Sequence, residues 1–144
     1  MVRISKLHDV SILHLYGEVS LLEMEMMEKI FASLHRHRHT KVLVDLAEVE
    51  HLHYRVFRQW IEAAEKFRST QGDLKLANAG ETATLLLKFT GADQYLADYS
   101  SLSDAILSFL GSPQSASVEN GGGGGGMARL TSGSGTADWE TVLH

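Results

Sequence analysis

The chain has 144 residues, of which 44% are hydrophobic and 22% charged, and its formal net charge is −5. This length predicts one domain with a hydrophobic core, and the acidic balance disfavours a general nucleic-acid-binding protein, which needs a basic face. The absence of cysteine excludes disulfides and thiolate chemistry. The sequence has no apolar run of about 18 residues and no secretion signal, so we expect a cytoplasmic protein without membrane insertion.

Two short strands are predicted first, over residues 2–5 and 10–15, because β-branched and alternating apolar residues occur in both. An amphipathic helix follows over 20–35, since its apolar residues recur three and four positions apart. Ser20 and Glu23 have the spacing of a capping box, so the helix is expected to begin there.

The rest of the folded part is predicted to alternate between strands and helices. Strands are expected where the sequence is continuously apolar or alternates, and helices where apolar residues recur with a period near 3.6. The predicted elements are a strand over 41–47, a helix over 54–70, a strand over 73–78, a short helix over 82–89, a weak strand over 94–99 and a last helix over 101–110.

This ββαβαβαβα order predicts an α/β sandwich, with a mixed central sheet of about five strands and about four helices. We expect the four helices to form one layer on the sheet. The residues predicted to lie in the core between them are Val42, Val44, Phe57, Trp60, Ile61 and Leu76.

The composition changes after Gly111. The only proline, Pro113, follows it, and a run of six glycines comes soon after. We therefore predict a domain over 1–111, a Gly/Ser-rich linker over 112–126, and a terminal segment over 127–144. That segment is either a disordered tail, a translational or cloning extension, or a short docking peptide. In the last case its anchors are Trp139, Val142 and Leu143.

Five short motifs occur in one order along residues 2–111. They are Gly17-Glu18, Val44-Asp45-Leu46 followed by Val49, Phe67 with Gly72-Asp-Leu-Lys-Leu, Leu86 with Phe89-Thr90-Gly91, and the segment Tyr99 to Ile106. Together they resemble the STAS domain of bacterial anti-sigma factor antagonists. The resemblance implies the STAS-like fold and a non-catalytic role in signal transduction and transcription regulation. Such an antagonist binds an anti-sigma factor that is also a serine kinase, and sigma is released.

In that family the kinase phosphorylates a serine in the pattern Asp-Ser-Ser-Gly, at the start of the helix after the buried strand, and this turns the antagonist off. Here the corresponding segment is His53-Tyr54-Arg55-Val56, which contains no serine or threonine. We therefore expect no phosphorylation at this place. Val56 also excludes the positive φ that glycine would allow, so the turn must be built differently.

Arg55 and Arg58 place positive charge near the positive end of the following helix, which is locally unfavourable and suggests that they contact an acidic partner or a phosphate. The residues that we expect to bind a protein partner are His53, Tyr54, Arg55, Arg58, Gln59, Glu18 and Asn78. The alternative is a domain that binds a nucleotide or another small anion near Arg55, Arg58 and Asn78, for example an accessory subunit of a transport complex. The sequence is also compatible with a homo-oligomer.

No enzyme or metal motif stands out in the sequence. There is no Gly-x-Ser-x-Gly elbow, phosphate-binding loop or His-Glu-x-x-His. Asp45 is interpreted as a strand-end residue bonded to backbone amides. The histidine pairs His35/His39 and His51/His53 have spacings that could suit a metal, but the first is interpreted as part of a solvated helix end and the second lacks a clear third ligand. We therefore expect no cofactor, metal or catalytic residue.

Overall fold

The computed structural model describes residues 1–110, so the expected linker over 112–126 and terminal segment over 127–144 lie outside the described residues. The elements are β1 (Val2–Leu7), β2 (Val10–Val19), α1 (Leu21–Arg36), β3 (Lys41–Leu52), α2 (Val56–Arg68), β4 (Asp73–Ala77), α3 (Glu81–Thr90), the short 3₁₀ helix η1 (Ala92–Gln94), β5 (Asp98–Tyr99) and α4 (Leu102–Leu110). The predicted order of strands and α-helices is confirmed.

The five strands form one mixed sheet in the order β1-β2-β3-β4-β5, as predicted. Strand β1 is antiparallel to β2, and the other neighbours are parallel. Strands β2 and β3 are longer than expected: their pairing continues to Val19 and Leu52, whereas β4 pairs with β3 only as far as Asp45 and Ala77. The carboxyl ends of β2 and β3 therefore extend beyond the rest of the sheet. The register shifts after Gly17, whose φ is 78°.

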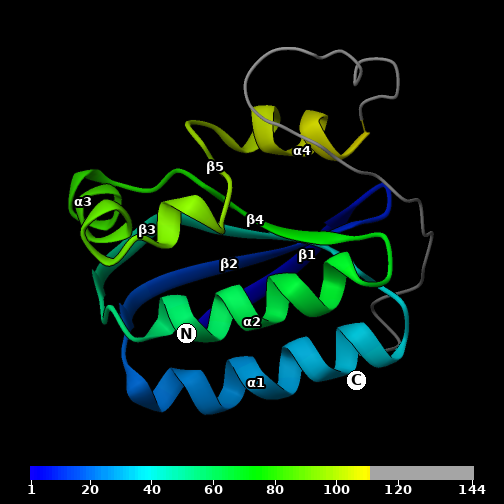
Figure 1. Ribbon diagram of the computed structural model, residues 1–144, viewed down its shortest axis with the longest axis horizontal. Coiled ribbons are helices and arrows are strands. Elements are labelled where there is room, and N and C mark those ends of the chain that lie inside the picture. Colours follow the sequence, from blue (N-terminus) through cyan, green and yellow to red (C-terminus); the bar gives the residue numbers. More distant parts are fainter. Residues whose placement is uncertain (111–144) are drawn as a thin grey trace.

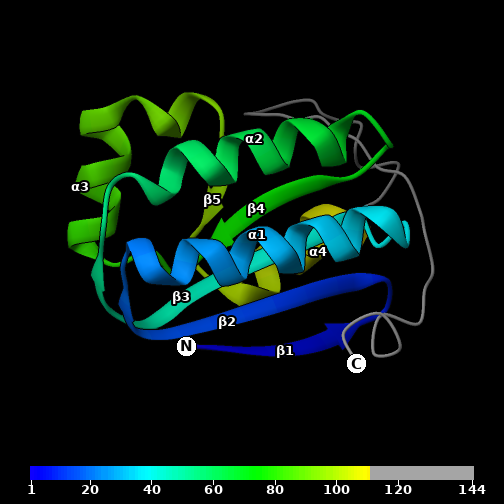
Figure 2. The ribbon, with the colours of Figure 1, turned by 90° about the horizontal axis from the view of Figure 1, so that it is seen from below.

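The helices cover both faces of the sheet, so the expected single layer of four helices is wrong. Helices α1 and α2 lie side by side on one face, α4 lies on the other, and α3 lies at one end of the sheet (Figures 1 and 2). The parallel connections through α1 and α2 step across the sheet in one direction, and right-handed crossovers then place both helices on the same face. No such rule acts on α4, because no strand follows it within residues 1–110.

The larger core lies between the sheet and the α1–α2 face. Of the six residues predicted there, five are buried, namely Val42, Val44, Phe57, Trp60 and Leu76, while Ile61 is half-buried at the margin of the cluster. The capping box at the start of α1 is confirmed, because the Ser20 amide donates to Glu23 Oε1 over 3.0 Å. This box fixes where the chain leaves β2 and enters α1.

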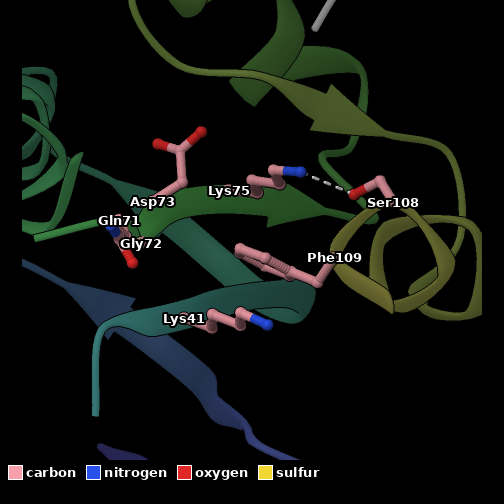
Figure 3. Close-up of a pocket in the computed structure, with 7 residues that line it drawn as sticks. All are labelled: Lys41, Gln71, Gly72, Asp73, Lys75, Ser108 and Phe109. Carbon is pink, nitrogen blue, oxygen red and sulfur yellow. Dashed lines mark hydrogen bonds between the residues drawn. The ribbon is translucent and has the colours of Figure 1, made fainter. Parts of the chain in front are cut away.

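A smaller core holds α4 on the opposite face, where Ile106 and Phe109 pack against the strands. Phe109 points toward the sheet, and the Lys75 ammonium lies 4.2 Å from the centre of its ring (Figure 3). Lys75 Nζ also donates to Ser108 Oγ over 2.8 Å. The cavity among these side chains measures about 10 Å³, the space of one water molecule, so this region serves packing.

Candidate functional site

The connection between β3 and α2 is a compact turn without positive φ. The His53 amide donates to the Val19 carbonyl oxygen over 2.9 Å, which ties the turn to the end of β2. The Arg55 amide donates to His53 Nδ1 over 3.2 Å, and the His53 ring stacks on Tyr54 with ring centres 4.9 Å apart. Arg55 precedes the helix in a right-handed helical conformation, and Val56 is fully buried. The turn is thus built from a histidine acceptor instead of a glycine.

Two exposed arginines, Arg55 and Arg58, lie at the start of α2. The first turn of this helix contains no acidic residue, and no side chain caps it. Their charges therefore lie near the positive end of the helix with no compensation from the helix itself, as the sequence predicted. This arrangement costs stability and favours an anionic group at the same place.

Two further predicted residues lie at this end of the sheet. The Tyr54 side chain is 53% exposed, whereas tyrosine is commonly more buried than this in folded proteins. Glu18 is exposed on β2 and pairs across the sheet with His51. Five of the seven predicted residues therefore lie at this end of the sheet, with Glu18 on β2 and the others in the turn and the first turn of α2. We call this the turn surface: Glu18, His53, Tyr54, Arg55 and Arg58.

The other two predicted residues have internal roles. Gln59 is 9% exposed, and its Nε2 donates to the Met24 carbonyl oxygen over 2.7 Å, which joins α2 to α1. Asn78 is half-buried with φ of 60°, and its Nδ2 donates to Asp45 Oδ1 over 2.9 Å. The side chains of Gln59 and Asn78 are therefore engaged with neighbouring elements of the domain.

Asp45 lies at the centre of a hydrogen-bond network that the sequence did not reveal. His14 Nδ1 donates to Asp45 Oδ2 over 2.8 Å, and the Ala47 amide donates to Oδ1 over 3.1 Å. On its other side His14 Nε2 is hydrogen-bonded to Ser5 Oγ over 2.9 Å. Burial raises the pKa of the Asp45 carboxyl, but the hydrogen bonds from Asn78, His14 and Ala47 outweigh it and hold the pKa below its ordinary value.

This network connects three adjacent strands, through Ser5, His14 and Asp45, to Asn78, which directly follows β4. The interpretation of Asp45 as a strand-end residue bonded to amides is wrong in two respects, because β3 continues to Leu52 and side chains supply two of its donors. Serine, histidine and aspartate in this order also occur in nucleophilic enzymes. Here the three side chains project from the middle of neighbouring strands, and we assign them to cross-linking the sheet.

The start of α1 and helix α3 lie at the same end of the molecule as the turn between β3 and α2 (Figures 1 and 2), and both elements carry exposed apolar residues. Leu22 at the start of α1 is 83% exposed, and on α3 Leu85 is 62% and Phe89 is 88% exposed. Leu85 and Phe89 are four residues apart and share one side of α3. Leu85, Leu86, Leu87 and Phe89 cannot all lie on one buried face of a helix. The sequence therefore already indicated that some of these apolar side chains are exposed.

The histidine-rich end of α1 differs from its prediction. Arg36, His37 and Arg38 are exposed, but His39 is 4% exposed, so the expected solvated helix end stops before it. Within residues 1–110 no three His, Cys, Asp or Glu side chains gather as a metal site would require. In the same range no helix has the length and apolar character needed to cross a bilayer.

No protein-family model matches the chain, and no curated protein matches it. Solved structures do. A candidate anti-sigma factor antagonist of Thermotoga maritima superposes with a TM-score of 0.68 at 20% identity, over 73% of this chain and 91% of its own. An anti-sigma factor antagonist of Mycobacterium paratuberculosis gives 0.66 at 20% identity, over 74% and 90% of the two chains.

The anti-sigma factor antagonist SpoIIAA of Bacillus, in its unphosphorylated form, gives a TM-score of 0.62 at 13% identity, over 83% of this chain and all of its own. The mixed five-stranded sheet with four helices is therefore the fold of STAS domains, as the motifs predicted.

Proposed function

We propose that this protein is a non-catalytic regulatory module of the anti-sigma factor antagonist type, acting in the bacterial cytoplasm by binding another protein. The turn surface is the observation that carries the proposal. It combines an exposed tyrosine with two uncompensated arginines at the start of α2, and aromatic and arginine side chains contribute most to protein interfaces. The STAS fold, with SpoIIAA among its solved examples, supports a partner of the anti-sigma factor class.

The partner is expected to present an acidic surface, which Arg55 and Arg58 would contact. The exposed side chains of Leu85 and Phe89, which share one side of α3, would extend the interface at the same end of the molecule. A partner of the serine-kinase type fits this chemistry. Control by serine phosphorylation does not, since residues 50–60 contain neither serine nor threonine.

The alternative of an anion-binding domain has less support. The first amides of α2 already donate to carbonyls of the turn, from Val56 to His53, from Phe57 to Tyr54 and from Arg58 to Arg55. The Asn78 side chain, expected to contact the anion, donates to Asp45. Apart from the Arg55 and Arg58 side chains, the donors expected to hold an anion are thus engaged within the domain.

Reversing the charge of the turn surface is expected to weaken partner binding without unfolding the domain. In the double variant Arg55→Glu/Arg58→Glu, two attractive contacts become repulsive, so the affinity should fall at least about tenfold, equivalent to about 1.4 kcal/mol. Isothermal titration calorimetry with a purified anti-sigma factor of the serine-kinase type, from the organism that encodes this chain, measures the change. Circular dichroism checks the fold.

The matched control is Arg36→Glu/Arg38→Glu, which makes the same change in net charge at exposed positions near the other end of α1. It should keep the affinity within about twofold, because surface charges away from an interface contribute little. Equal affinities of the Arg55/Arg58 variant and the unchanged protein would remove the turn surface from the interface.

A further inference from the structure

Strand β1 forms an open edge of the sheet. It pairs with β2 on one side, and no helix of the described part of the chain lies beyond it (Figure 2). The Tyr16 amide donates to the Met1 carbonyl oxygen over 3.0 Å, and the Met1 amino group donates to the Tyr16 carbonyl oxygen over 3.4 Å. Bonded and non-bonded positions alternate along an antiparallel pair, so the backbone N–H and C=O groups of Val2, Ile4 and Lys6 point away from β2. These groups are free to pair with another strand.

The two sides of this edge differ in chemistry. Val2 and Ile4 are half-buried and pack at the rim of the core that lies under α1 and α2. Arg3 projects to the opposite face of the sheet, is exposed, and has no ion-pair partner within residues 1–110. A strand that fits this edge therefore carries apolar side chains on one side and acidic side chains on the other.

Residues 137–143, Ala-Asp-Trp-Glu-Thr-Val-Leu, have this pattern, and they lie outside the described residues. Asp138 and Glu140 flank Trp139, and Leu143 follows Trp139 at an even spacing. Extended chain would place the two carboxylates on one side and Trp139 with Leu143 on the other. The segment contains no glycine or proline, and its aromatic and β-branched residues favour a strand.

The chain between α4 and this segment is long enough to reach any edge of the domain. Residues 111–136 connect the two, and a chain of about 26 residues reaches up to about 85 Å. A domain of this size has a radius of gyration of only about 13 Å. Because both partners belong to one chain, their effective concentration is raised, so a contact that is weak between separate molecules suffices here.

We propose that residues 137–143 add a strand to the sheet along the free edge of β1. Trp139 then lies beside Ile4 at the rim of the core, and the two carboxylates lie beside Arg3. Main-chain hydrogen bonds supply the attraction, and the side chains select the register, because a shift by one residue would exchange the two faces. This contact is separate from the turn surface and does not depend on the proposed protein partner.

Amide hydrogen exchange of the full chain, measured by NMR, tests the proposal. The Ile4 and Lys6 amides should exchange at least about tenfold more slowly in the unchanged protein than in the variant Trp139→Ser/Leu143→Ser, which lacks the apolar side of the segment. The Ser5 amide, which faces β2, should be protected equally in both proteins and serves as the internal reference. The matched control Met127→Ser/Leu130→Ser removes two apolar side chains that precede the segment, and it should leave the exchange at Ile4 unchanged.

Charge reversal tests which side of the segment faces Arg3. Asp138→Lys/Glu140→Lys should speed exchange at Ile4, because it replaces attraction to Arg3 by repulsion. Adding Arg3→Glu to this variant should slow the exchange again, since opposite charges then face each other with their signs exchanged.

Equal exchange at Ile4 in the unchanged protein and in Trp139→Ser/Leu143→Ser would overturn the proposal. Protection that survives this variant and rises with protein concentration would also overturn it, because a second copy of the chain would then be the strand that pairs with β1. Charge-reversed variants that exchange equally with and without Arg3→Glu would contradict the placement of the carboxylates beside Arg3.

Discussion

Replacing Trp60 with alanine will lower the free energy of unfolding by about 3–5 kcal/mol. Trp60 is fully buried between α2 and the sheet, and its ring meets Phe57 edge-on with ring centres 5.8 Å apart. Alanine would remove that contact and leave a cavity that the surrounding core can fill only in part. Chemical denaturation followed by far-UV circular dichroism measures the loss.

Phe89→Ala is the control for the loss of an aromatic side chain from a helix. Phe89 is 88% exposed, so its removal should change the free energy of unfolding by less than about 0.5 kcal/mol. A Trp60→Ala variant as stable as the unchanged protein would contradict the placement of this residue in the core.

Asp45→Asn will have the second largest effect, a loss of about 2 kcal/mol at pH 7. The substitution keeps the size of the side chain but removes the charge that accepts from His14, Asn78 and the Ala47 amide. Hydrogen bonds to a charged acceptor are stronger than those to a neutral one, and the asparagine NH₂ group would face donors. Urea denaturation of both proteins measures the difference.

The effect of Asp45 should depend on pH with a defined sign. Because the pKa of Asp45 in the folded protein lies below its ordinary value, its stabilising contribution is present above the unfolded-state pKa of about 3.9. It is lost as the pH falls through the lower folded-state pKa. The difference between the unchanged protein and Asp45→Asn should therefore shrink between pH 5 and the acid limit of the fold.

Asp98→Asn, at an exposed carboxylate on β5, is the control for loss of one negative charge. It should leave the stability within about 0.5 kcal/mol at pH 7. If Asp45→Asn costs no more than Asp98→Asn, the network does not hold the strands together.

The elements that could be predicted are those whose sequence pattern is formed by residues close together in the chain. The capping box of Ser20 and Glu23 and the apolar spacing of α2 involve residues within a few positions of each other, and both are seen in the structure. The strand β3 was predicted too short, because Glu48 and Glu50 make its second half look like a loop. The structure explains this: that half pairs with β2 but extends past β4, so polar side chains there remain exposed.

Features that depend on distant contacts were not predictable. His14 and Asp45 are 31 residues apart, and Asn78 is 33 residues from Asp45, so only the sheet register brings them together. The apolar stripe of α4 shows that the helix is buried on one side but not which face of the sheet it covers. Likewise, Gln59 was expected to contact a protein partner, while the structure shows its side chain donating to the Met24 carbonyl oxygen.

The most direct test of the proposed function is to measure the affinity of the full chain for a serine-kinase anti-sigma factor with and without Mg²⁺-ATP, and to map phosphate by mass spectrometry. The turn His53-Tyr54-Arg55-Val56 offers the kinase no serine or threonine. We therefore expect binding of equal strength under both conditions and no phosphate between residues 50 and 60. A stoichiometric phosphate in that segment, necessarily on Tyr54, with loss of binding would contradict the account, as would an absence of binding under either condition.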